Sequence, residues 1–247
     1  MSRNFDMLNE AAPQIGVAPT AKARNAEATG VDAAQVQSGA VNEEIARLVQ
    51  RVFLSAPLTE SSKVVAFCGV DRRAGCSWIC ARAAEFLTTQ TPARVCIVDA
   101  NLRDPSLHQH FRSKLSPGFA EAIRSTAPID NFVRTTRTDR LWLMTAGEVS
   151  EDPNGVLSAG RLQTRFGDLR EEFDFLLIDV PAIGASREAL LIGQLSDGII
   201  LVVASNATRR EPARVAKQNC DEAKIPILGA VLNKRTYPIP EALYRRL

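Results

Sequence analysis

The loop of residues 70–77 combines residue types that suit phosphate binding. It contains Gly75 and Ser77, and it lies between an apolar run at residues 64–68 and a helical pattern that begins at Ser77. This arrangement matches the end of the phosphate-binding pattern G-x-x-x-x-G-K-[ST], in which backbone N–H groups at a helix start surround the phosphates. The spacing therefore predicts a phosphate-binding loop, and a plain strand-to-helix turn is the alternative interpretation.

Several positions of this loop depart from that pattern. Val70 replaces the first glycine, and Cys76 stands where a lysine is expected. The lysine offsets charge that builds on the phosphates during transfer, and removing such a stabiliser typically costs ~10² to 10³ in rate. Arg72 and Arg73 either supply positive charge through their guanidinium groups or remain solvated loop residues. Cys76, at the predicted helix start, is either a thiol of lowered pKa or a small replacement for the lysine.

Short apolar runs alternate with helical patterns along most of the chain. Strands that are apolar on both sides and separated by helices predict an α/β fold, a doubly wound and mostly parallel sheet flanked by helices. The expected strands are residues 64–68, 95–98, 141–144, 175–178, 198–203 and 227–232. The expected helices are residues 77–88, 119–124, 161–172, 187–194 and 210–223. Ligands bind outside the carboxyl ends of such strands, so the loops that follow the strands carry the most information about function.

An amphipathic helix is expected before the sheet, at residues 42–54. Its apolar residues, such as Ile45, Leu48 and Phe53, recur at three- and four-residue steps, and Asn42 is expected to cap it. The predicted organisation is a disordered tail at 1–40, one domain at 41–235 that includes a short linker at 56–62, and a carboxyl-terminal tail at 236–247.

The composition is that of an ordinary globular protein. Of 247 residues, 45% are hydrophobic and 23% charged, with a formal net charge of +2, which argues against fibrous proteins and against a nucleic-acid partner. No stretch approaches the ~20 apolar residues that cross a bilayer, and the amino end lacks a signal-peptide pattern, so a cytoplasmic location is expected. The five cysteines form no C-x-x-C pair, which predicts reduced thiols rather than structural zinc.

The segment that follows the run at 95–98 carries a more specific signal. It reads D-A-N-L-R-D-P-S-L-H from Asp99 to His108, and it resembles the second Walker motif of the bacterial tyrosine kinases of capsule and exopolysaccharide assembly. That motif reads D-x-D-x-R-x-P-S-L-H, so Asn101 replaces its second aspartate. The run that ends in Asp179 is similar to the family's Walker B strand. Further matches are residues 118–123, 146–147, 153–154 and 229–233. The likeness extends from about residue 42 to about residue 234 and implies a P-loop NTPase fold of the partition-ATPase-like branch.

This resemblance implies a site for ATP and Mg²⁺. By analogy with the family, Ser77, Asp99 and Asp179 hold the metal, because Mg²⁺ prefers hard oxygen ligands. The residues implied at the nucleotide are Arg73, Ala74, Gly75, Cys76, Ser77, Arg103 and Asn233, the last against adenine. Asp99, Asn101 and Asp179 make up the implied catalytic set. Asn101 is not expected to activate a tyrosine hydroxyl, because an amide does not take up a proton at neutral pH.

The resemblance and the departures from it predict a weakened kinase or a pseudokinase that regulates exopolysaccharide or capsule assembly. A membrane-spanning chain-length regulator is the implied partner, and through it a peripheral location at the inner face of the cell membrane. The helix at 42–54, with Glu44, Arg47 and Arg51, is similar to a loosened form of the family's oligomerisation helix E-x-x-R-x-x-R. Self-association through this helix and packing on its own domain are both open.

Two further functional interpretations are open. The first is a competent tyrosine autokinase with an unusual loop, whose own substrates would be Tyr237 and Tyr244 near the carboxyl end. The second is a partition or division-site ATPase, which shares the fold. Those ATPases use an additional lysine early in the loop, where this chain has Asp71.

Overall fold

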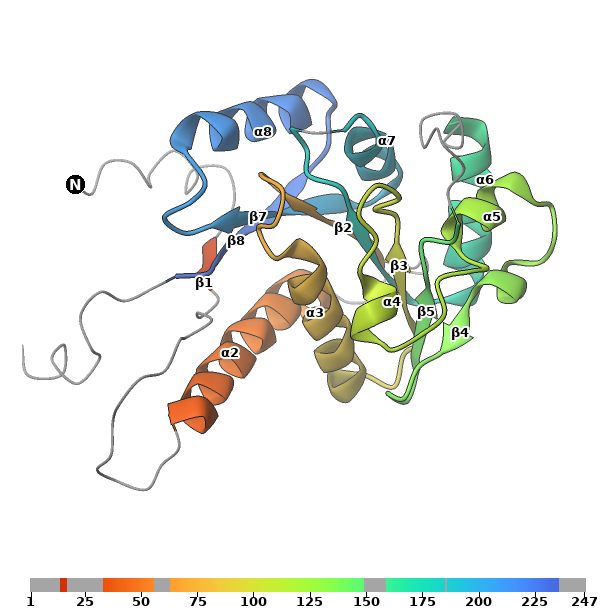
Figure 1. Cartoon of the computed structure of the whole chain (residues 1–247), viewed down its shortest axis with the longest axis horizontal. Helices are drawn as coiled ribbons and strands as arrows, with labels where there is room; N and C mark the ends of the chain where they lie inside the picture. Colours follow the sequence, from red (N-terminus) through yellow and green to blue (C-terminus); the bar gives the residue numbers. More distant parts are fainter. Residues whose placement is uncertain (1–13, 17–32, 56–62, 149–158, 185, 236–247) are drawn as a thin grey trace, which may run out of the picture.

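A computed structural model describes residues 14–16, 33–55, 63–148, 159–184 and 186–235 of the chain (Figure 1). The predicted linker at 56–62, the predicted tail at 236–247 and most of the predicted tail at 1–40 lie outside the described residues, as does the match at 153–154.

The centre of the fold is an eight-stranded sheet with the order β1-β8-β7-β2-β6-β3-β5-β4. Its strands are β1 (Gln14–Gly16), β2 (Lys63–Gly69), β3 (Val95–Asp99), β4 (Arg134–Thr135), β5 (Leu141–Met144), β6 (Phe175–Val180), β7 (Gly198–Ala204) and β8 (Ile227–Asn233). Every pair of neighbours is parallel except β4 and β5. The six predicted strands and the doubly wound α/β class are confirmed.

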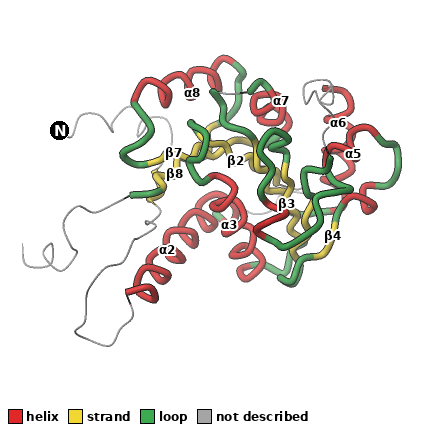
Figure 2. The backbone as a smooth tube through the Cα atoms, viewed as in Figure 1, coloured by secondary structure: helices red, strands yellow, loops and turns green. Residues whose placement is uncertain are grey.

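Helices cover both faces of the sheet. They are α2 (Ala33–Val49), α3 (Cys76–Gln90), α4 (Leu107–His110), α5 (Phe119–Arg124), α6 (Ala159–Glu172), α7 (Glu188–Leu195) and α8 (Arg210–Glu222), with a 3₁₀ turn η2 (Ile129–Phe132). Figure 2 shows α2 and α3 on one side of the strands and α7 and α8 on the other. Within the described residues, no helix is both long and apolar enough to cross a bilayer.

Alternation along the central strands builds one core on each face. In β2, Val64 and Ala66 pack with residues of α5 to α8, whereas Val65 and Phe67 pack with residues of α2 and α3. Successive side chains of a strand point to opposite faces, so a strand buried on both sides reads as one continuous apolar run. This is why the apolar runs predict the strands well.

The helix predicted at 42–54 is longer than expected and begins at Ala33. It continues through Val49 into a π-helical turn, η1 (Gln50–Leu54). Asn42 therefore lies inside the helix and is no cap; its Oδ1 instead accepts a hydrogen bond from Arg82 at 3.0 Å. Ile45 is buried in the core beside β2 and α3, so the apolar face packs on its own domain. Ala and Gln favour the helix even without a packed face, which is why the apolar pattern places its start too late.

The prediction of a disordered tail over 1–40 is wrong where the structure describes it. Residues 33–40 belong to α2, and β1 pairs with β8 in parallel, with Gln14 opposite Ala230. An edge strand such as β8 offers unpaired backbone N–H and C=O groups, and pairing with them needs no apolar pattern in the added strand. The sequence therefore gave no signal for β1.

Candidate phosphate- and metal-binding site

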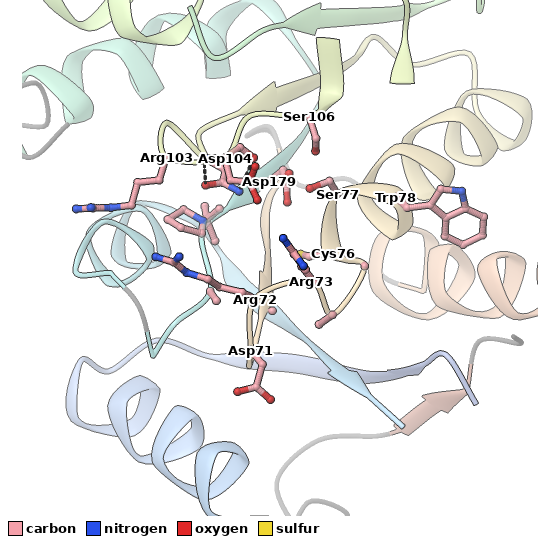
Figure 3. A pocket seen from close by; sticks show the side chains of 17 residues that line it. Asp71, Arg72, Arg73, Cys76, Ser77, Trp78, Arg103, Asp104, Ser106 and Asp179 are labelled. Carbon is pink, nitrogen blue, oxygen red and sulfur yellow. Dashed lines mark hydrogen bonds between the residues drawn. The ribbon is translucent and has the colours of Figure 1, made fainter. Parts of the chain in front are cut away.

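The carboxyl ends of β2, β3 and β6 surround a cavity of about 440 Å³, here called the cleft (Figure 3). The 70–77 loop forms one wall, the turn after β3 forms another, and Asp179 and the residues after it complete the lining. Parallel strands end at one edge of the sheet, which brings together segments that lie far apart in the sequence. The structure thus assembles most of the predicted site residues in one place.

Side chains at the end of β8 and directly after it donate hydrogen bonds to the 70–77 loop. Nδ2 of Asn233 donates a hydrogen bond to the carbonyl oxygen of Ala74 at 2.8 Å, and Nζ of Lys234 donates one to the carbonyl oxygen of Arg73 at 2.6 Å. Gly75 has a φ of 89° and precedes the start of α3, and a Cβ there would collide with Nδ2 of Asn233. Glycine is therefore required at this position for both backbone conformation and space.

Asp99 lies at the end of β3, fully buried, and its carboxylate binds the turn that follows. Its Oδ2 accepts hydrogen bonds from the backbone N–H groups of Ser106 and Leu107, each at 3.0 Å, and its Oδ1 accepts one from Asn101 at 3.2 Å. Burial raises the pKa of Asp99, and these three N–H groups oppose that rise. In this structure Asp99 organises the wall of the cleft.

Asp179 lies directly opposite Asp99 in the register of β6 and β3, and it is also buried. Neither of its carboxylate oxygens has a hydrogen-bond partner of normal geometry in the described part of the chain. Burial raises the pKa of Asp179 and the nearby charge of Asp99 raises it further, while the adjacent Ser77 hydroxyl and Cys76 thiol act in the opposite direction. A buried carboxylate without a partner is costly, so its environment favours a cation or a proton at this point.

The Cys76 thiol lies at the start of α3 beside Asp179. Burial raises its pKa well above the ordinary value, and the charge of Asp179 adds to the effect. This environment disfavours a thiol activated by the helix start, because desolvation and a neighbouring carboxylate oppose the effect of the helix dipole. Across the described residues, no three His, Cys, Asp or Glu side chains are grouped to hold a metal ion. A metal here would need the Ser77 hydroxyl, phosphate oxygens and water in addition to Asp179, which is how proteins usually bind Mg²⁺.

The other predicted residues are placed as follows. Asn101 lines the cleft, but its side chain is engaged in a tight turn with the backbone of Asp104, at 3.0 and 3.3 Å. Arg103 also lines the cleft and forms an ion pair with Glu188 at 3.0 Å, pointing away from Asp179 in Figure 3. Asn233 lies behind the 70–77 loop and is not one of the residues that line the cleft.

Some residues of the site were missed by the sequence reading. Ser106 lines the cleft and its N–H binds Asp99, and Lys234 contacts the loop from β8. Both residues follow the end of a strand. The rule that ligands bind beyond the carboxyl ends of strands could therefore have indicated them. Trp78, expected to pack under the loop, is 41% exposed and points away from the cleft in Figure 3. It lies on the outer face of α3, whose inner face carries Ile79, Cys80 and Ala83.

Bacterial tyrosine-protein kinases are among the proteins whose sequences resemble this chain. No protein-family model matches the chain. The tyrosine-protein kinase YwqD of Bacillus subtilis is 27% identical over 144 residues, which cover 58% of this chain and 61% of that protein. The tyrosine-protein kinase CpsD of Streptococcus pneumoniae is 29% identical over 142 residues, covering 57% and 63%. The chain is a relative of the bacterial tyrosine-protein kinases. The match spans less than two thirds of the length of either protein.

Solved structures share the fold of this tyrosine-kinase relative. The kinase domain of the Escherichia coli tyrosine kinase ETK superposes with a TM-score of 0.79 at 16% identity and covers 97% of both chains. The chimerical protein CapA2B2 has a TM-score of 0.78 at 18% identity and covers 94% of this chain and 98% of its own. The septum site-determining protein MinD of Pyrococcus horikoshii, complexed with Mg-ADP, has a TM-score of 0.62 at 18% identity over 74% of this chain and 76% of its own. The P-loop NTPase fold is therefore confirmed.

Proposed function

We propose that this chain is a tyrosine-kinase-like protein of exopolysaccharide or capsule assembly that binds ATP and Mg²⁺ in the cleft and transfers phosphate weakly or not at all. The observation that carries the proposal is the carboxylate of Asp179, which is buried at the cleft without a hydrogen-bond partner in the described part of the chain. A divalent cation at this point would satisfy both of its oxygens, and the Ser77 hydroxyl is adjacent to Asp179.

In this proposal different residues of the cleft bind the metal and the phosphate. Ser77 and Asp179 hold the ion, and Asp99 contributes through water, because its own oxygens already accept three backbone N–H groups. The N–H groups around Gly75 and Cys76, at the start of α3, bind phosphate oxygens. Bound Mg²⁺ would neutralise negative charge on the phosphates.

Two features of the cleft support weak phosphate transfer. Cys76 brings no positive charge to the phosphates, and its half-buried thiol stays protonated because its pKa is raised. Asn101 is held in a turn by the backbone of Asp104, and an amide has no basicity with which to activate a tyrosine hydroxyl. Phosphoryl transfer depends almost entirely on positioning and charge, so the loss of both groups leaves few other means of acceleration.

A binding role implies partners, and the charged face of α2 is the surface we propose for them. Arg47 pairs with Glu44 at 2.6 Å on the outside of the helix, while the apolar face is used by the chain's own core. This face is proposed to contact a second copy of the chain or a membrane-spanning chain-length regulator, which would place the protein at the inner face of the membrane. The alternatives of a competent autokinase and of a partition-type ATPase remain competing proposals. Asp71 stands where those ATPases use a lysine, and this difference disfavours the second of them.

The decisive experiment is calorimetric titration with ATP, with and without Mg²⁺. In the wild-type chain Mg²⁺ is expected to strengthen ATP binding by about tenfold or more, since a charged contact contributes about 1.5 to 3 kcal/mol. Asp179→Asn should remove that dependence on Mg²⁺, whereas Asp130→Asn, an exposed aspartate in η2, should not. If ATP fails to bind under either condition, or if Asp179→Asn keeps the full Mg²⁺ effect, the proposal is wrong.

A further inference from the structure

A second cavity of about 460 Å³ lies on the other side of the 70–77 loop. It is bounded by Asp71 to Arg73 of that loop, by the segment between β7 and α8, and by the residue that follows β8. Its lining includes four basic residues, Arg72, Arg73, Arg209 and Lys234, and one acidic residue, Asp71; the side chain of Arg73 extends toward the cleft in Figure 3. We call this second cavity the arginine cavity. The cavity is therefore strongly cationic.

The positive charge of the arginine cavity is not neutralised by the protein. Among the described residues, the guanidinium groups of Arg72, Arg73 and Arg209 form no hydrogen bond or ion pair, and the Asp71 carboxylate pairs with none of them. A single unpaired arginine on a surface is ordinary, because water solvates it. Arg72 and Arg209 line one cavity together with Lys234, so their charges repel one another, and an anion between them removes that repulsion.

Hydrogen bonds connect the backbone segments that carry the basic residues of the cavity. Nζ of Lys234 donates to the carbonyl oxygen of Arg73, which leaves its remaining protons free for another acceptor. The N–H of Ser205 donates to the carbonyl oxygen of Asn233 at 2.7 Å, so the loops after β7 and β8 are joined as well. Arg73 and Lys234 have φ values of 61° and 57°, in the left-handed region where glycine is the residue of low cost. Long basic side chains stand at both positions although glycine would strain the backbone less.

We propose that the arginine cavity binds a terminal phosphate group that carries two negative charges. Guanidinium groups bind phosphate oxygens in pairs, and an ammonium adds a point charge, so this set of side chains suits a doubly charged, multidentate anion. A neutral ligand such as a nucleobase would gain little from four cations. The phosphate could be carried by a tyrosine side chain of another protein or by a nucleotide that reaches over from the cleft, since Arg72 and Arg73 line both cavities.

The test is a titration followed by backbone amide chemical shifts of residues 204–211 and 234, with inorganic phosphate, O-phosphotyrosine, ADP and adenosine as probes. Inorganic phosphate and O-phosphotyrosine are expected to shift these amides. Arg209→Gln carries the test because that side chain makes no contact whose loss would disturb the fold. It should weaken the binding of both probes about tenfold, as expected for one charged hydrogen bond. Lys234→Gln should act in the same direction. Arg214→Gln, on the same helix but paired with Glu211 and outside the cavity, is the matched control and should have no effect.

The probes also identify the carrier of the phosphate. Tighter binding of O-phosphotyrosine than of ADP, sensitive to Arg209→Gln, supports a phosphoprotein; the reverse order supports a nucleotide. The proposal is overturned if inorganic phosphate and O-phosphotyrosine cause no shifts, if Arg209→Gln leaves their affinity unchanged, or if adenosine shifts the same amides equally. It stands apart from nucleotide binding in the cleft, because Asp179→Asn should abolish the Mg²⁺ dependence of ATP binding and leave O-phosphotyrosine binding intact.

Discussion

Nδ2 of Asn233 donates a hydrogen bond to the carbonyl oxygen of Ala74 at 2.8 Å, and this contact joins the last strand of the sheet to the 70–77 loop. Both groups are buried, and Gly75 approaches the same amide so closely that no larger residue fits. The shape of the 70–77 loop therefore depends on a residue 159 positions away in the sequence.

Removal of this contact should loosen the loop and destabilise the fold. We expect Asn233→Ala to lower the free energy of unfolding by about 1 to 3 kcal/mol, because it leaves a buried carbonyl without its donor. Urea denaturation followed by circular dichroism measures the change. Asn131→Ala, at an exposed position of η2, should cost much less. Equal effects of the two substitutions would mean that the contact with Ala74 does not stabilise the loop.

Cys76→Lys should strengthen the binding of ATP with Mg²⁺. The substitution returns a cation to a loop whose backbone donors around Gly75 and Ser77 are in place, and one charged hydrogen bond contributes about 1 to 3 kcal/mol. The matched control is Cys76→Met, which adds a side chain of similar length without the charge. If calorimetry gives the lysine variant the same ATP affinity as the methionine variant or a lower one, either the loop does not bind phosphate or Arg72 and Arg73 already supply the charge.

Asp179 should make the stability of the metal-free protein depend on pH. Its pKa is raised in the folded state, to about 8, so between its unfolded value near 4 and that pKa the folded chain binds more protons than the unfolded chain. The free energy of unfolding should therefore fall as pH rises through this window. Asp179→Asn removes the titrating group, so the variant should gain stability over the wild type at pH 8.5, by roughly 1 to 3 kcal/mol, and gain little at pH 5.

Denaturation at the two pH values, without added divalent ions, measures this difference. Asp130→Asn controls for the general effect of removing one negative charge, because Asp130 is exposed. A stability difference between wild type and Asp179→Asn that is the same at both pH values would contradict a raised pKa.

The central strands were predictable because each is buried on both faces. Such a strand, for example β6, reads as a nearly continuous apolar run without alternating polar residues. The order of Walker-like segments then brought Asp99 and Asp179 to one edge, where the structure places them in register. What the sequence did not reveal depends on contacts without a side-chain pattern. β1 joins β8 through backbone groups, and the hydrogen bond between Asn233 and Ala74 joins the end of β8 to a loop 159 residues earlier in the sequence.

Charge reversal on the outer face of α2 should change assembly without affecting the fold. Arg47 and Arg51 are exposed, whereas the apolar residues of the helix are buried in the domain's own core. Arg47→Glu with Arg51→Glu is expected to shift the molar mass seen by light scattering, or to weaken capture by the cytoplasmic segment of a membrane-spanning regulator. Arg214→Glu, on the exposed face of α8, controls for the change of net charge. With folding intact, no change in either measurement would assign α2 to packing within the domain alone.

The last prediction is that the chain has little or no tyrosine kinase activity of its own. Cys76 brings no positive charge to the phosphates, Asn101 brings no basic group to the hydroxyl, and the two tyrosines of the sequence, Tyr237 and Tyr244, are the candidate substrates. The penalties need not add, because the first two act on one transition state. Incubation with ATP and Mg²⁺, with and without the cytoplasmic segment of the membrane partner, followed by mass spectrometry, should give no more phosphate on these tyrosines than an Asp179→Ala control.

Robust phosphorylation that disappears in Asp99→Ala or Asp179→Ala would identify a working kinase. In that case Arg73, whose side chain extends toward the centre of the cleft in Figure 3, would be the first residue to test as the replacement cation.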